Sequence, residues 1–261
     1  MQSMITTHTT NGKLYPDAGS YWTYVEKTRL RRIIALAPTM NLGRYLDVGC
    51  GDGQFFRGLR RHFQIEDAFG VDSSGTALLA ANKEGLQTKK VDLSSDVLPF
   101  ANGTFDTVSM IEVIEHLHDV EHCLKEVSRV LRPGGFLLLT TPNMASWHGR
   151  VSLIAGYQPL CLDIGYRRHY GSLITLSGKS AGHIRGFTLP ALKELLDEFN
   201  FRLVGVGGEP AVVSGMSLAI RALAQLDRAI STFSSFASGF VIWCTTKPAD
   251  ATHKPKRFAT A

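Results

Sequence analysis

Short apolar segments alternate with helical segments along this chain, and this alternation limits its possible folds more than any other feature. The apolar segments expected as strands are residues 45–48, 68–71, 105–111, 135–140, 201–206 and 240–246, and residues 89–92 are expected as a weaker strand between the second and third of these. Between the strands at 105–111 and 135–140, residues Leu117, Val120, Leu124, Val127 and Leu131 recur at spacings of three and four, which predicts a helix with one buried face. Nearly continuous apolar strands separated by helices are typical of a parallel sheet covered on both faces. The pattern therefore predicts an α/β domain.

The chain has 261 residues, 44% of them hydrophobic, which is enough for one large domain with a substantial core. We expect an N-terminal tail and helix over residues 1–40, a main domain over 41–247 and a basic tail over 248–261. Cap insertions are expected at about 144–186, which fits neither strand nor helix period, and at 209–238. The second insertion contains an apolar helical face between Met216 and Ile230, which could dock on the domain, contact a partner or lie on a membrane surface.

Charge and cysteine content exclude several classes of protein. The net charge is +5, but the basic residues are dispersed, so nucleic-acid binding is not indicated. The four cysteines form no CxxC pair, which argues against a zinc knuckle or a disulfide framework and favours reduced thiols in the cytoplasm. The chain shows neither a signal peptide nor an apolar run of about 20 residues.

A glycine-rich loop, Gly49-Cys50-Gly51-Asp52-Gly53, directly follows the first strand and precedes a helix starting near Gln54. Glycines there let the backbone turn tightly and let a ligand approach the main chain. The dinucleotide fingerprint is incomplete, because Gln54 occupies the place of its last glycine, and no Lys-Ser or Lys-Thr follows to make a phosphate-binding loop. Asp47, at the strand end, would repel a pyrophosphate and suits a cationic ligand better.

Two more acidic residues follow neighbouring strands. Asp72 ends the second strand, roughly 20 residues past the glycine loop, where a carboxylate reaches ribose hydroxyls. Asp92 follows the third strand, where it could meet an adenine amino group. Together with Asp47, these side chains predict a site for a nucleoside that carries a positively charged tail.

Five segments in order over residues 45–143 resemble the motifs of class I S-adenosylmethionine-dependent methyltransferases: YLDVGCGDG, GVDSS, VDL, LPFANGTFDTVSMIEVIEHLHD and LKEVSRVLRPGGFLLLTTPN. The later segment GHIRGFTLPALKELLDEFNF is similar to the type 11 and ubiquinone O-methyltransferase-like groups. The resemblance implies a Rossmann-like, seven-stranded, mostly parallel sheet with helices on both faces and the last strand antiparallel. It also implies S-adenosylmethionine as the cofactor, bound by Asp47, Gly49, Cys50, Gly51, Gly53, Asp72, Ser73, Asp92, Leu93 and Ile111.

Methyl transfer from a sulfonium is an in-line displacement, and a hydroxyl acceptor must also lose its proton. His116, just past the fourth strand, is the first candidate base, since histidine titrates near neutral pH. The alternative is that His116 only orients its loop together with Glu112 and Glu115. His183 is the second candidate, because related ubiquinone methyltransferases carry a histidine in a similar place; its alternative is a surface loop histidine. No metal site is expected, since no third ligand stands out beside the two glutamates.

Residues 111–114 read Ile-Glu-Val-Ile, which is not the Asn/Asp-Pro-Pro-Tyr/Phe motif of many nucleobase amino methyltransferases, and no cysteine follows a proline as a C5 nucleophile would. The predicted reaction is therefore O-methylation of a small or lipid-like metabolite, with possible peripheral membrane contact and no nucleic-acid partner. A sugar or surface-glycan acceptor, and a non-catalytic nucleoside-binding domain, are the alternatives.

Overall fold

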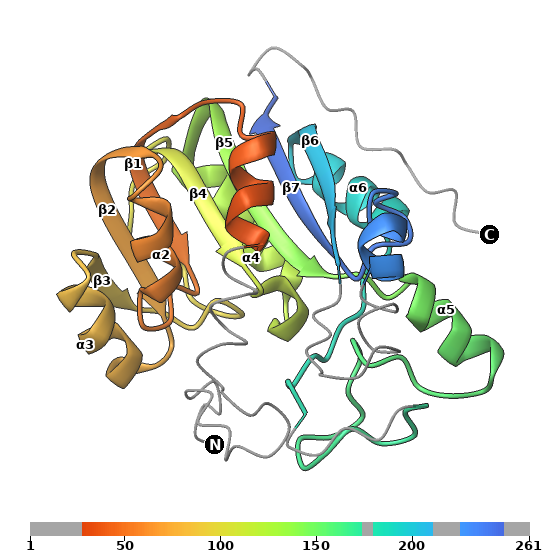
Figure 1. The fold of residues 1–261 in the computed structure, drawn as a ribbon. Helices are drawn as coiled ribbons and strands as arrows, with labels where there is room; N and C mark the ends of the chain where they lie inside the picture. Colours follow the sequence, from red (N-terminus) through yellow and green to blue (C-terminus); the bar gives the residue numbers. More distant parts are fainter. Residues whose placement is uncertain (1–27, 174–179, 211–224, 248–261) are drawn as a thin grey trace, which may run out of the picture.

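Strands form a single sheet with helices against both of its faces (Figure 1). The computed structural model describes residues 28–173, 180–210 and 225–247. Within these ranges the seven strands lie in the order β3-β2-β1-β4-β5-β7-β6. Their bounds are β1 Asn41–Val48, β2 Gln64–Asp72, β3 Gln87–Lys90, β4 Phe105–Ile111, β5 Leu131–Pro142, β6 Phe201–Glu209 and β7 Gly239–Thr246. Only β7 runs antiparallel to its neighbours, β5 and β6, so the predicted fold is confirmed.

Four of the helices, α3 to α6, begin at polar capping residues. Asp119 accepts a hydrogen bond from the backbone N–H of His122 at 2.9 Å at the start of α4, and Thr188 caps α6, which has Pro190 in its first turn. The bounds are α2 Gln54–Leu59, α3 Gly75–Lys83, the 3-10 turn η1 Ile114–His116, α4 Val120–Val130, α5 Trp147–Ile154 and α6 Leu189–Glu198. Residues 28–36 and 225–230 are also helical.

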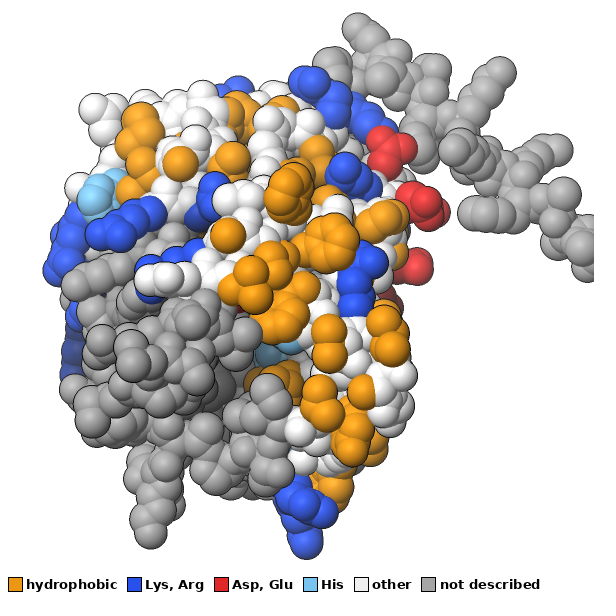
Figure 2. Space-filling model, turned by 45° about the vertical axis from the view of Figure 1, so that its right-hand side comes forward, with side chains coloured by type: hydrophobic (Ala, Val, Ile, Leu, Met, Phe, Trp, Pro, Cys, Tyr) orange, Lys and Arg blue, Asp and Glu red, His pale blue; other side chains and the backbone are white. Residues whose placement is uncertain are grey.

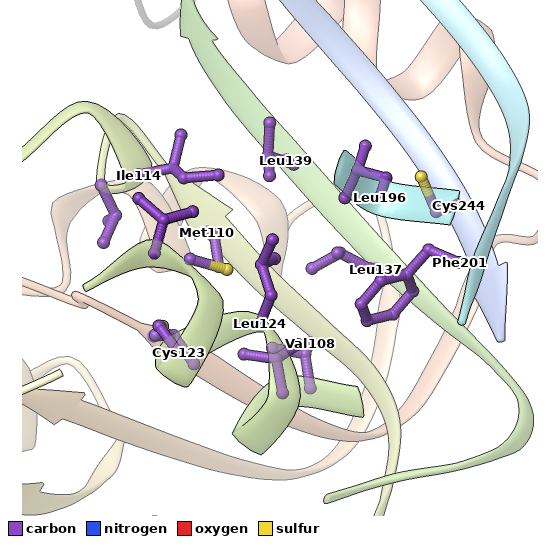
Figure 3. Close-up of a cluster of buried hydrophobic side chains, with 14 of the residues drawn as sticks. Val108, Met110, Ile114, Cys123, Leu124, Leu137, Leu139, Leu196, Phe201 and Cys244 are labelled. Atoms are coloured by element: carbon purple, nitrogen blue, oxygen red, sulfur yellow. The ribbon is translucent and has the colours of Figure 1, made fainter. Parts of the chain in front are cut away.

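Alternate side chains of each strand enter two separate cores, one on each face of the sheet. One core joins β4 and β5 to α4 and α6, and Figure 3 shows Met110, Leu124 and Leu196 meeting in it. The other core joins Tyr45 and Trp243 to α2, α3 and the helix of residues 28–36. Burial on both faces explains why the strands appear in the sequence as nearly continuous apolar runs.

Several bounds differ from those expected. β1 begins at Asn41, where it already pairs with β2, and β5 begins at Leu131, four residues before the expected strand of residues 135–140. Helix α5 lies in the insertion in which no helix was expected. Three of its apolar side chains, Val151, Leu153 and Ile154, are exposed. Its apolar residues therefore do not recur on a single buried face, which is the pattern that predicts a helix from sequence. The expected helical residues 21–27 and 216–224, and both predicted tails, lie outside the described residues.

Candidate functional site

The candidate site lies at the carboxyl edge of the parallel strands. The glycine loop follows β1, Asp72 ends β2, Asp92 follows β3 and η1 follows β4. Because β1, β2, β3 and β4 pair in parallel, these segments meet at the same edge of the sheet. Open α/β sheets bind ligands at this edge.

The three glycines of the loop have left-handed backbone conformations, with φ of +73° at Gly49, +51° at Gly51 and +78° at Gly53. A Cβ at Gly49 would lie 2.4 Å from a methyl of Val113, and one at Gly53 would lie 3.0 Å from the backbone of Ala81. A Cβ at Gly51 would meet no atom of the described residues within 4 Å. Two of the glycines are therefore required by packing, whereas Gly51 borders open space.

Asp72 is buried, and its carboxylate fixes the glycine loop against β2. One oxygen accepts the backbone N–H of Gly51 at 3.0 Å and the other accepts that of Ser74 at 2.8 Å. Asp47 lies near it, buried at the end of β1, and accepts a hydrogen bond from the hydroxyl of Ser109 at 2.6 Å. Burial and, to a smaller extent, the charge of Asp72 raise the pKa of Asp47 to about 7, against the opposing effect of the Ser109 hydrogen bond.

The other predicted cofactor residues take different positions. The Cys50 side chain is buried in the core beside Gly70, so only its backbone lines the loop, and burial raises the pKa of its thiol. Ser73 and Ile111 are half-buried. Asp92 is exposed and accepts the backbone N–H of Ser94 at 2.9 Å, while Leu93 packs against the core next to it. None of these placements conflicts with a nucleoside bound along the edge.

Arg29 is a site residue that the sequence did not reveal. Its guanidinium donates to both carboxylate oxygens of Glu209, at 2.9 and 3.1 Å from Nε, and lies 3.2 Å from the carboxylate of Glu112. Burial acts to lower its pKa, but the charges of Glu112 and Glu209 outweigh burial and keep Arg29 protonated. Glu112 has a φ of +55°, which is rare for a residue with a side chain, and Thr140 and Arg29 hold it there.

We expect Arg29→Met to lower the free energy of unfolding by about 3 kcal/mol at neutral pH, because it leaves the buried Glu209 unpaired. Burial already raises the pKa of Glu209, and losing Arg29 raises it further. When a carboxyl has a higher pKa in the folded than in the unfolded state, the free energy of unfolding decreases as the pH rises above the unfolded-state pKa, because the unfolded chain then releases its proton more easily. The loss should therefore shrink as pH falls toward about 4–5, measured by urea unfolding.

The control variant is Arg57→Met, which removes a more exposed ion pair with Glu84 and should cost about 0–1 kcal/mol. An Arg29→Met penalty that is equally large at acidic and neutral pH would contradict the buried-charge explanation.

The two candidate histidines lie together, although 67 positions separate them. The ring centroids of His116 and His183 are 4.9 Å apart, and Nε2 of His183 lies 4.0 Å from Oε1 of Glu115. Glu115 is almost fully buried, and its other carboxylate oxygen accepts the hydroxyl of Thr141 at 3.0 Å. Burial, followed by the charge of Glu112, raises the pKa of Glu115, and burial lowers the pKa of His183.

Backbone contacts fix this pair. Asp163 accepts the N–H groups of Gly182 and His183, at 2.9 and 3.1 Å, and the backbone oxygen of Glu115 accepts those of Ile184 and Arg185, at 3.0 and 3.1 Å. Motif spacing gave no sign of Asp163 or of this contact, because both depend on how Asp163 and residues 182–185 lie against η1.

The chemistry of the edge fits S-adenosylmethionine. Asp47 and Asp72 place two neighbouring carboxylates beside the glycine loop, and neither forms an ion pair with a lysine or arginine in the part of the chain that the structure describes. A cationic ligand is therefore favoured there over a pyrophosphate. The open space at Gly51 allows the ligand to approach the main chain.

Comparisons with known proteins agree with this geometry. A family model described as "Methyltransferase domain" matches residues 21–206. The ubiquinone biosynthesis O-methyltransferase of Sinorhizobium medicae is 32% identical over 104 residues, which cover 38% of this chain and 41% of that protein. The chain spans less than half the length of the curated relatives that it matches.

Two solved structures share the fold. One is an S-adenosylmethionine-dependent methyltransferase from Thermotoga maritima, described as a possible histamine N-methyltransferase, with a TM-score of 0.58 and 20% identity over 88% of this chain and 94% of that one. The other is from a complex between the Haloferax volcanii Trm112 methyltransferase activator and a putative methyltransferase. It has a TM-score of 0.61 and 16% identity, and the match covers 88% of this chain and 95% of that one. At these identities the likeness shows the fold alone.

Proposed function

Because this chain belongs to the class I S-adenosylmethionine-dependent methyltransferases, we propose that it transfers a methyl group to an oxygen atom of a small or lipid-like metabolite. The observation that carries the proposal is the group of Glu115, His116 and His183 at the edge that also bears the glycine loop. A neutral alcohol or phenol is a weak nucleophile and must lose its proton as its oxygen attacks, whereas a neutral amine is already nucleophilic. Groups able to assist proton loss therefore favour an oxygen acceptor.

S-adenosylmethionine, when bound, supplies an electrophilic methyl group on a positively charged sulfur. The protein contributes binding and alignment: Asp72 and Asp92 suit the ribose and the adenine, and the glycine loop suits the methionine end. Alignment of the acceptor with the methyl carbon can contribute several kcal/mol to catalysis.

Exposed apolar side chains support a lipid-like acceptor and contact with a membrane surface. Figure 2 shows hydrophobic side chains gathered on the face where α5 lies, with basic side chains among them. Leu153, Ile154 and Phe233 are 53%, 88% and 69% exposed, and the guanidinium of Arg150 lies over the ring of Phe236 at 4.7 Å. None of the described helices has the length and apolar character needed to cross a bilayer. The four buried, unpaired cysteines support the proposed cytoplasmic location.

The test is a methyl-release assay with radiolabelled S-adenosylmethionine and an acceptor panel of phenols with and without isoprenoid tails, sugars, and amines. The expected result is transfer to a hydroxyl compound, with higher kcat/KM for the tailed members. Transfer confined to amines would contradict the oxygen assignment, and transfer to sugars alone would replace the lipid-like acceptor by a glycan intermediate. Binding of S-adenosylhomocysteine without any turnover would favour a non-catalytic domain.

We expect Asp72→Ala to weaken binding of S-adenosylhomocysteine by about 2–4 kcal/mol, because a ribose would lose two charge-assisted hydrogen bonds. Isothermal titration calorimetry measures the change. Asp67→Ala, which removes an exposed carboxylate from the same strand, is the control and should bind normally. Unchanged affinity in a folded Asp72→Ala variant would disprove the ribose assignment.

A further inference from the structure

Glu115, His116 and His183 form a compact group of donor atoms. Each offers one atom that can bind a metal, and these atoms all lie within 4.8 Å of one another. The 4.0 Å gap between Glu115 Oε1 and His183 Nε2 is too long for a hydrogen bond. Ligands at about 2.0–2.2 Å from one ion lie about 3–4 Å apart, so an ion would fit between these atoms after a small adjustment.

The carboxylate of Glu115 has no adequate partner. Its Oε1 atom is buried without a hydrogen bond, and within the described ranges no lysine or arginine forms an ion pair with it. Arg29 acts on it only weakly, since its guanidinium pairs with Glu112 and Glu209. A buried carboxylate without a cation is costly.

His116 is oriented as a metal-binding histidine usually is. Its Nδ1 lies 3.1 Å from the backbone oxygen of Gly182. A carbonyl oxygen can only accept, so Nδ1 carries the proton and Nε2 keeps the lone pair. Metal-binding histidines typically donate their second ring N–H to a carbonyl or carboxylate in this way. Gly182 itself is held by Asp163, so the orientation is fixed before any ion binds.

We propose that Glu115, His116 and His183 bind a divalent transition-metal ion. Two imidazoles and one carboxylate suit ions such as Zn²⁺, Fe²⁺ or Mn²⁺ better than Ca²⁺ or Mg²⁺, which prefer oxygen ligands. The ion neutralises Glu115 and leaves coordination positions open, since the protein supplies three donors.

The role of this ion in the reaction rests on the proposed function. A divalent ion lowers the pKa of a hydroxyl that binds to it. The acceptor proton then passes to solvent, an oxygen lone pair forms the new C–O bond, and the C–S bond breaks with its electron pair remaining on sulfur. The products are the methyl ether and neutral S-adenosylhomocysteine.

The experiment titrates Co²⁺, a spectroscopic stand-in for such ions, into the chelator-treated protein and records visible ligand-field absorption and calorimetric heat. We expect one Co²⁺ per chain. Glu115→Gln and His183→Ala should each weaken binding by more than the roughly 10–100-fold that loss of a supporting contact costs. His62→Ala, which removes an exposed histidine, should bind as the wild type does. Calorimetry with S-adenosylhomocysteine shows whether each variant is folded.

Absence of saturable binding, or equal binding by wild type, Glu115→Gln and His183→Ala, overturns the site. The readout needs no acceptor, so it is separate from the proposed function. Co²⁺ binding lost in both variants supports the site even when no member of the panel is methylated. Methyl transfer that survives chelation at full rate overturns the role of the ion and leaves the O-methyltransferase proposal standing.

Discussion

Replacing Gly51 by valine abolishes binding of S-adenosylmethionine and S-adenosylhomocysteine while the domain stays folded. The added side chain would project into space that no described residue occupies within 4 Å of its Cβ, where the family resemblance places the methionine end of the cofactor. A β-branched residue at a φ of +51° also carries strain of about 1–2 kcal/mol. Isothermal titration calorimetry should find no binding, and thermal unfolding should find a small decrease in Tm.

Gly134→Val is the matched control. Gly134 also has a left-handed backbone, with φ of +74°, and a Cβ there would meet no atom within 4 Å, but it lies at the opposite end of β5 from the site. It therefore carries the same backbone strain without the cofactor contact. Normal binding by folded Gly51→Val would show that this glycine serves only the turn.

His116→Ala lowers kcat for the hydroxyl acceptor by about 10²–10⁴, with the affinity for S-adenosylhomocysteine nearly unchanged. The imidazole lies beside Glu115 and His183, past the end of β4, so its loss affects the acceptor more than the cofactor. The reduction is expected whether the ring accepts the proton or holds an ion that promotes proton loss. Steady-state kinetics with the best acceptor of the panel measures it.

His118→Ala, two residues further on and exposed, is the control and should retain the wild-type kcat. A small loss of kcat in His116→Ala, together with weaker cofactor binding, would instead show that His116 only orients the loop.

Most of the sheet could be predicted from the sequence because its central strands are buried on both faces and were visible as apolar runs, whereas the exposed edge strand β3, with sequence QTKK, gave only a weak signal. The strand-end residues Asp47, Asp72 and Asp92 could be placed at one edge for the same reason, since parallel topology determines where strand ends meet. The predicted cofactor and catalytic roles remain predictions that the variants above test.

Contacts that depend on the path of a loop could not be predicted. His183 reaches Glu115 only because Asp163 and the backbone of Glu115 hold residues 182–185 over η1. Neither the two-residue repeat of a strand nor the 3.6-residue repeat of a helix predicts such a contact between loops. Arg29 was equally hidden, because its partners Glu112 and Glu209 lie 83 and 180 positions away and the residue reads as part of a basic helix face. Helix α5 was missed because its apolar residues are exposed.

The position of β7 determines the order in which the protein can be completed during synthesis. β7 is the last strand in the sequence, yet it lies between β5 and β6. On the ribosome, β6 therefore emerges before the strand that joins it to the rest of the sheet. The helix of residues 28–36 is made much earlier, but it cannot complete its contacts until β6 and β7 are present. Trp243 of β7 donates its indole N–H to the backbone oxygen of Ile33, and Arg29 pairs with Glu209 of β6. A nascent chain ending before residue 239 lacks the strand between β5 and β6, so the carboxyl edge near Glu209 can be assembled only after β7 has been made.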